Sequence, residues 1–133
     1  MSTSFNFDEN YRSEILIPQQ TETVNLYLMD YLDIIDDFPN FKNEQIKFIQ
    51  DFLNKSNIWY PKIINYIYTQ TNSTNQVSLL SIYVLSAPEN NNSIFGLEFS
   101  SEADAEHGIG IKIESKNMNI LEYGSADLAF TPY

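Results

Sequence analysis

Apolar and polar residues alternate with a period of two in several short stretches of the chain, which is the pattern of half-buried β-strands. This alternation predicts strands over residues 13–18, 22–29, 94–99, 109–114 and 118–123. In the second of these strands Val24, Leu26 and Leu28 share one face. Residues 77–85 are apolar at nearly every position, which is typical of a central strand covered on both faces. A short polar turn at 115–117 predicts that the last two strands form an antiparallel hairpin.

The middle of the chain has helical periodicity instead. Apolar residues within 43–55 recur at i, i+3 and i+7, which predicts an amphipathic helix. A second helix is predicted from about residue 59 to about residue 70, because Pro61 is tolerated only in a first turn. A break at Ser56 and Asn57 between the two helices favours an αα-hairpin.

These elements predict a single α+β domain over residues 1–133. Its sheet is expected to be mostly antiparallel, with about five to six strands, and the two-helix hairpin is expected to pack on one face. A chain of 133 residues is long enough to bury a core without disulfides or a structural metal.

The net charge of the chain argues against nucleic acids and anionic membranes as partners. The formal net charge is −11, from 18 acidic and seven basic residues. A nucleic-acid-binding surface needs clustered Lys and Arg, and an anionic membrane attracts the same residues, so neither partner is expected. A basic protein is the expected partner. The simpler alternative is that the acidity serves solubility alone.

The chain has no cysteine, which excludes disulfides, thiol catalysis and thiolate metal sites. Its N-terminal residues do not resemble a secretory leader, and no apolar stretch is long enough to span a bilayer, so a cytoplasmic location is expected. Phosphate-binding and hydrolase motifs are missing from the sequence, and no cofactor is expected.

An acidic and apolar stretch between the predicted strand 22–29 and the first helix is a candidate binding surface. Its aspartates would steer a basic partner, and its large apolar residues would anchor that partner. Alternatively, the apolar residues dock on the core and the acids are solvated. The candidate partner-binding residues are Asp30, Tyr31, Asp33, Ile34, Asp36, Asp37 and Phe38.

A second candidate lies just before the strand 109–114, where Asp104, Glu106 and His107 fall within four positions. One His and two carboxylates could hold a metal or act as acid and base. The favoured alternative is a structural loop, in which Gly108 and Gly110 supply backbone freedom and the polar side chains bond the loop backbone.

The C-terminal third resembles a family of uncharacterised bacterial domains with an acid-x-Glu-His-Gly-x-Gly pattern followed by Gly-x-x-Asp-x-Ala-Phe. The matching positions are Asp104, Glu106, His107, Gly108, Gly110, Gly124, Asp127, Ala129 and Phe130. The family usually has Trp before the first acid, where this chain has Ala103.

The resemblance implies a function as well. Some members of that family look like immunity proteins, which bind and neutralise a cognate toxin. We therefore expect a non-enzymatic, immunity-type inhibitor that acts by occlusion, with a basic nuclease as one candidate toxin. The alternatives are a metal-dependent or hydrolytic enzyme that uses the loop at Asp104, Glu106 and His107, or a regulatory module with another partner.

Overall fold

The computed structural model describes residues 6–29, 43–74, 76–86, 92–102 and 106–133. These residues form a six-stranded sheet in which strands consecutive in sequence are neighbours. All adjacent pairs are antiparallel except β2 and β3, which are parallel. The predicted α+β class with a mostly antiparallel sheet is confirmed. The strands are β1 (Arg12–Ile15), β2 (Val24–Leu28), β3 (Val77–Val84), β4 (Ile94–Ser101), β5 (Ile109–Glu114) and β6 (Ile120–Gly124).

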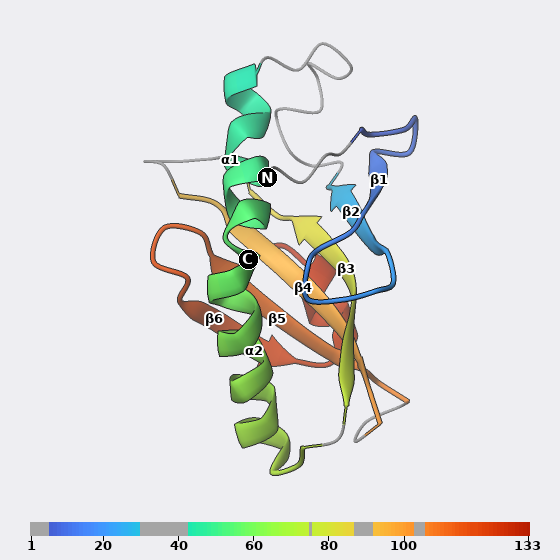
Figure 1. The fold of residues 1–133 in the computed structure, drawn as a ribbon, viewed down its shortest axis with the longest axis vertical. Coiled ribbons are helices and arrows are strands. Elements are labelled where there is room, and N and C mark those ends of the chain that lie inside the picture. Colours follow the sequence, from blue (N-terminus) through green and yellow to red (C-terminus); the bar gives the residue numbers. More distant parts are fainter. Residues whose placement is uncertain (1–5, 30–42, 75, 87–91, 103–105) are drawn as a thin grey trace.

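Two helices, α1 (Asn43–Asn54) and α2 (Ser56–Thr71), stand between β2 and β3 in the chain and lie on one face of the sheet (Figure 1). They do not form the expected hairpin. Only Lys55 separates them, and α2 continues in the direction of α1, whereas an αα-hairpin needs a loop of about two to five residues. Because β2 and β3 are parallel, the chain must cross from one end of the sheet to the other between them, and the two helices form this crossover. Within the described residues, no helix is long and apolar enough to cross a membrane.

The second helix begins earlier than Pro61 suggests. It starts at Ser56, which places Pro61 in the second turn, where its missing N–H leaves the carbonyl of Asn57 without the usual partner. Asn57 is exposed, so water can reach this carbonyl. At the junction, the indole Nε1 of Trp59 donates a hydrogen bond of 2.8 Å to the carbonyl of Phe52. A side chain from the first turn of α2 therefore stabilises the break between the helices.

Three stacked aromatic rings form the centre of the core between the helices and the sheet. Phe52 lies between Phe95 of β4 and Trp59 of α2, with ring centroids 4.0 Å and 4.8 Å apart and nearly parallel planes. All three side chains are almost completely buried. Alternate residues of each inner strand, such as Leu26, Ile82 and Leu97, point to this same face, as the period-two pattern predicts.

The apolar run of β3 results from a β-bulge and not from the burial of both faces that the sequence predicted. The pairing of β3 with β4 shifts between Leu79 and Ser81, so Leu80 is an extra residue in a β-bulge and is exposed. The backbone of Leu79 is bonded instead by the Gln20 side chain, which accepts from its N–H at 2.7 Å and donates to its carbonyl at 3.0 Å. The apolar run is thus ordinary alternation interrupted by one residue.

Strand boundaries differ from the prediction at both edges of the sheet, and β1 ends at Ile15 rather than at residue 18. The last strand starts at Ile120 rather than at residue 118, because Met118 has a φ of 59° and cannot continue an extended strand. The turn before it is held by Glu114, whose side chain accepts hydrogen bonds from the backbone N–H groups of Asn117 and Asn119.

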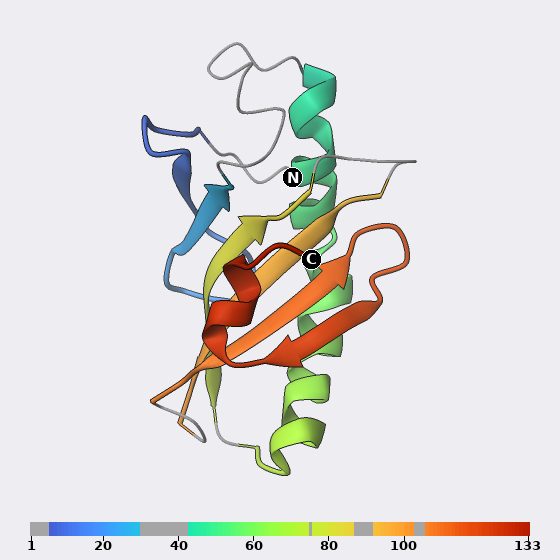
Figure 2. The same cartoon turned by 180° about the vertical axis from the view of Figure 1, so that it is seen from behind.

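A short 3₁₀ helix, η2 (Ala126–Phe130), lies on the face of the sheet opposite α1 and α2 (Figure 2). The sequence analysis did not predict it. A Cβ atom added to Gly96 would stand 1.7 Å from the carbonyl oxygen of Ala129, and one added to Gly110 would stand 2.4 Å from that of Ser125. The missing side chains of these two strand residues therefore let the backbone of η2 rest on the sheet.

The close contact between Gly96 and the backbone of η2 can be tested by substitution. We expect Gly96→Ala to lower the free energy of unfolding by about 1–3 kcal/mol, because the new methyl group overlaps backbone that must move. Gly124→Ala is the control, since its added Cβ would be 3.5 Å from the Leu128 side chain, an ordinary contact. Urea denaturation of both variants measures the difference. Equal stabilities would contradict the assigned position of η2.

Candidate functional site

The face of the sheet that carries η2 is the polar one. Residues that alternate with the core positions of β2 to β5 point to it, among them Tyr27, Tyr83, Glu98 and Lys112. We call this the outer face. Because η2 covers β4 and β5, Tyr27 and Tyr83 on the neighbouring strands remain partly exposed.

A row of three aromatic rings crosses the outer face from β2 to η2. Tyr27 and Tyr83 are direct partners in the parallel register of β2 and β3, and their rings stack with centroids 5.1 Å apart and planes 11° apart. Phe130 meets Tyr83 edge to face, with centroids 5.5 Å apart. Phe130 remains 40% exposed, so the row ends in accessible apolar surface. We call Tyr27, Tyr83 and Phe130 the aromatic row.

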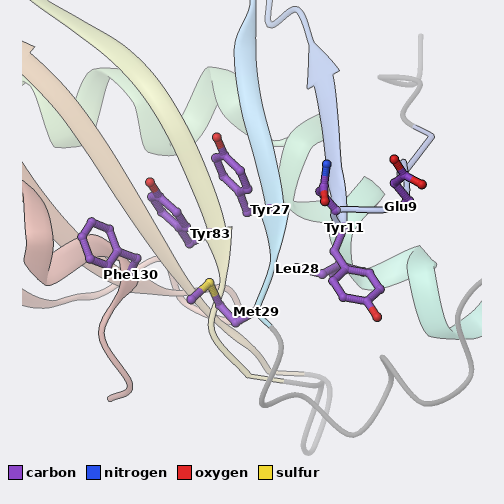
Figure 3. Close-up of a pocket in the computed structure, with 8 residues that line it drawn as sticks. Glu9, Tyr11, Tyr27, Leu28, Met29, Tyr83 and Phe130 are labelled. Atoms are coloured by element: carbon purple, nitrogen blue, oxygen red, sulfur yellow. The ribbon is translucent and has the colours of Figure 1, made fainter.

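The aromatic row lines a pocket of about 430 Å³ (Figure 3). Leu28 and Met29 line it at the end of β2, and residues 9–11 line it from the turn before β1. This volume is in the range of pockets that hold a small ligand or one large side chain. Glu9 contributes the charged group of this lining, and its side chain is exposed.

The turn before β1 is held in an unusual conformation at the pocket. Tyr11 has a φ of 59°, which is rare for a bulky residue. The side chain of Asp8 accepts hydrogen bonds from the backbone N–H groups of Asn10 and Arg12, and the carbonyl of Tyr11 accepts one from Leu28. These bonds tie the turn to β2 and hold residues 9–11 at the edge of the pocket.

The central ring of the row is held by a carboxylate. The hydroxyl of Tyr83 donates a hydrogen bond of 2.8 Å to Oε1 of Glu98 on β4. Burial of the ring, followed by the hydrogen bond to Glu98 and then the negative charge of Glu98, raises the pKa of Tyr83 well above its ordinary value. Tyr83 is therefore neutral throughout the physiological range and remains a hydrogen-bond donor.

The cations near the outer face are already paired. Lys112 is buried, and its Nζ lies 3.1 Å from Oγ1 of Thr131, 3.4 Å from the carbonyl of Pro132 and 3.5 Å from Oε1 of Glu122. Arg12 forms an ion pair with Glu14 at 2.8 Å. Lys112 thus anchors the end of the chain after η2, and neither charge projects into the pocket.

The candidate residues chosen from the sequence fall into two groups. The acidic stretch, with Asp30, Tyr31, Asp33, Ile34, Asp36, Asp37 and Phe38, lies outside the described residues, and so does Asp104. The other candidates near the C-terminus are described. Glu106 and His107 are exposed. Neither the binding role of the acidic stretch nor an acid–base role of the loop is tested by these positions.

The described part of the loop has a clear structural role. The carbonyl of His107 accepts a hydrogen bond of 3.1 Å from the N–H of Ala126, the first residue of η2. Gly108 has a φ of 66°, which favours glycine, and Asp127 accepts a hydrogen bond from the hydroxyl of Ser125. Together with Gly110, these residues dock η2 on the sheet. Among the residues that the structure describes, no three His, Asp or Glu side chains group as metal ligands would.

The chain matches one known protein family over nearly its whole length. The model of a family described as "Domain of unknown function (DUF6985)" matches residues 4–130. The chain belongs to this family. No curated protein and no solved structure matches it. The matched range includes all strands and helices described above, so the sheet, the two helices and η2 are the fold of this DUF6985 member.

The sequence analysis of this DUF6985 member missed the aromatic row, although one signal was available. The alternation that puts Val24, Leu26 and Leu28 on the core face requires Tyr27 to point to the other face. Tyr83 was hidden by the bulge at Leu80, which made its strand look apolar on both sides. Phe130 was noted only as a matching position of the family pattern.

The bond between Tyr83 and Glu98 predicts a specific dependence on alkaline pH. The folded chain keeps the Tyr83 proton, whereas the unfolded chain releases it near pH 10. The free energy of unfolding therefore falls as the pH rises above about 10. We expect Tyr83→Phe to be less stable at neutral pH by about 1 kcal/mol, and to lose less stability than the wild type between about pH 9 and about pH 11.

Denaturant titrations across this pH range measure the effect, and Tyr133→Phe is the control. Tyr133 is 64% exposed, so its replacement should leave the pH profile unchanged. Identical profiles for the wild type and Tyr83→Phe would show that this proton is not held in the folded state.

Proposed function

We propose that this chain is a protein-binding module of the immunity type, which neutralises a basic toxin in the cytoplasm by covering the toxin's working surface. The observation that carries the proposal is the pocket on the outer face. It combines exposed aromatic surface with one acidic residue, Glu9, in a chain of net charge −11. Polar faces of sheets ordinarily carry short, solvated side chains, so an open aromatic pocket there favours a binding role.

The aromatic row has the composition of an interface hot spot. Tyrosine is enriched among the residues that dominate binding energies, and aromatic residues in general are enriched at interfaces. Tyr27 and Tyr83 are positioned by the sheet, and Phe130 by η2, so binding would require little ordering of these side chains. A pre-organised surface of this kind favours a folded protein as partner.

Charge supports a basic partner. Long-range attraction between an acidic chain and a basic one accelerates encounter and disfavours acidic competitors. Met29 lines the pocket and is followed directly in the sequence by the acidic stretch that starts at Asp30. We propose that this stretch and the outer face contribute to the same binding surface. The toxin as the partner comes from the resemblance of the C-terminal pattern to immunity proteins.

The proposal predicts a measurable interaction. A toxin gene is expected beside this gene. Its product should bind the purified chain in calorimetry with a one-to-one stoichiometry, and the affinity should fall as the salt concentration rises. The double variant Tyr27→Ala/Phe130→Ala should bind at least about 30-fold more weakly, because it removes two exposed aromatic anchors. It should also fail to protect cells that express the toxin.

The control is Ile58→Ala, which removes an exposed apolar side chain from α2 on the opposite side of the sheet. Ile58 is 53% exposed. The control should bind and protect like the wild type. Far-UV circular dichroism of each variant confirms that it is folded. If the wild-type chain and the neighbouring toxin do not bind each other, the proposed function is wrong.

A further inference from the structure

Several polar groups beside the aromatic row are engaged within the chain. The hydroxyl of Tyr83 interacts with both Glu98 and Ser81. The guanidinium group of Arg12, which is the cross-strand partner of Tyr27, forms an ion pair of 2.8 Å within β1. A charged group that entered the pocket would lose water and would find these groups already engaged, so the pocket suits an uncharged group.

The pocket has an apolar end beside η2. Figure 3 shows Phe130, Tyr83 and Met29 at this end, and Glu9 at the other end, across β1. Met29 is partly exposed, and Phe130 is 40% exposed although its ring meets Tyr83 edge to face. Part of the Phe130 ring therefore stays open to solvent. We call Met29, Tyr83 and Phe130 the apolar end of the pocket.

From this arrangement we infer that the apolar end receives an aromatic side chain of the partner protein, and that basic residues flank this side chain in the partner. The inference rests on the proposed function, because it names the group with which the partner is anchored. Tyr27 and Tyr83 are stacked, and Phe130 meets Tyr83 edge to face. These are the two arrangements that aromatic pairs prefer. A further ring on the open side of Phe130 would extend the aromatic row by one member.

A ring fits this end better than an aliphatic side chain does. The edge of an aromatic ring is positive and its face is negative, so two rings attract each other beyond the effect of burying their surface. Met29 adds a thioether sulfur, which makes favourable contacts with ring edges, and its unbranched side chain adapts to the shape of a ligand. The volume of about 430 Å³ is sufficient for a large aromatic side chain.

The charges at the rim indicate what surrounds the ring in the partner. Asp8 and Glu9, in the turn before β1, are exposed. Arg12 and Glu14 of β1 compensate each other as an ion pair. The described part of the rim on this side therefore has a net negative charge. A basic residue next to the partner's ring would extend along the pocket toward this rim, where its charge stays in solvent and is attracted by the acids.

The test observes the methionine methyl groups of the full-length chain. The chain has three methionines, so ¹³C-methyl labelling gives one signal in the pocket, from Met29, and one from Met118, which is buried and does not line the pocket. The probes are three capped tripeptides. They are Lys-Phe-Lys, an analogue of it with cyclohexylalanine in place of Phe, and Glu-Phe-Glu.

We expect the Lys-Phe-Lys peptide to bind with a millimolar Kd and to shift the Met29 signal through the ring current of its Phe, while the Met118 signal stays in place. The cyclohexylalanine peptide should bind several-fold more weakly, because it has the shape of a ring but not its charge distribution. The Glu-Phe-Glu peptide should also bind several-fold more weakly, and this difference should shrink as the salt concentration rises.

Two variants and a control connect this binding to the pocket. Phe130→Leu keeps an apolar side chain but removes the ring, and it should weaken the binding of the Lys-Phe-Lys peptide several-fold. Glu9→Gln, at an exposed position, should reduce the preference for Lys over Glu in the peptide. Tyr133→Leu removes an exposed ring that does not line the pocket and should leave binding unchanged. Circular dichroism checks that Phe130→Leu folds, and Glu9→Gln tests the pocket even where Phe130→Leu does not fold.

Each other outcome overturns the inference. Equal binding of the cyclohexylalanine peptide would show a pocket without preference for a ring, equal binding of the Glu-Phe-Glu peptide would show no selection of basic neighbours, and the absence of a Met29 shift at high millimolar concentration would show no site. The two proposals also fail separately. A toxin that binds while the peptides do not would leave the proposed function intact. A peptide that binds while the toxin does not would leave only the pocket.

Discussion

The close approach of η2 to the sheet is the constraint on which the outer face depends. The backbone of η2 can lie there only because Gly96 and Gly110 have no side chains under Ala129 and Ser125. Its position places Phe130 against Tyr83 and brings the chain end to the buried ammonium group of Lys112. A buried Lys needs compensating polar contacts, and the residues after η2 supply them. The pocket and the C-terminal segment are thus parts of one packing arrangement.

One side of the sheet packs the core against the helices, and the other side carries the surface that we propose binds a partner. On the inner side, the stack of Phe95, Phe52 and Trp59 joins the helices to β4 and so fixes the crossover from β2 to β3. That crossover is what allows β2 and β3 to be parallel, and the parallel register places Tyr27 beside Tyr83. The aromatic row on the outer side therefore depends on a core packed on the other side.

Periodicity predicted the elements of this fold better than their connections. The strands and the first helix are set by local alternation, which the sequence displays directly. The helix junction depends on the bond from the Trp59 indole to the carbonyl of Phe52, which hydrophobic periodicity does not display. The contact of η2 with Gly96 is not local at all, because Gly96 is 33 residues before Ala129 in the sequence. The aromatic row combines three elements distant in the chain, so only the pairing of the strands could reveal it.

Four residues of the family pattern, His107, Gly108, Gly110 and Asp127, shape the backbone, whereas a fifth, Phe130, contributes its ring to the aromatic row. Gly108 and Gly110 allow the turn and the close approach, His107 provides a carbonyl to the start of η2, and Asp127 bonds Ser125 beside it. Residues with such roles explain why η2 lies where it does, but they leave the side-chain chemistry to other positions. For this chain the binding chemistry is therefore better sought in the surface that these residues build, where aromatic rings and carboxylates meet, than in the loop itself.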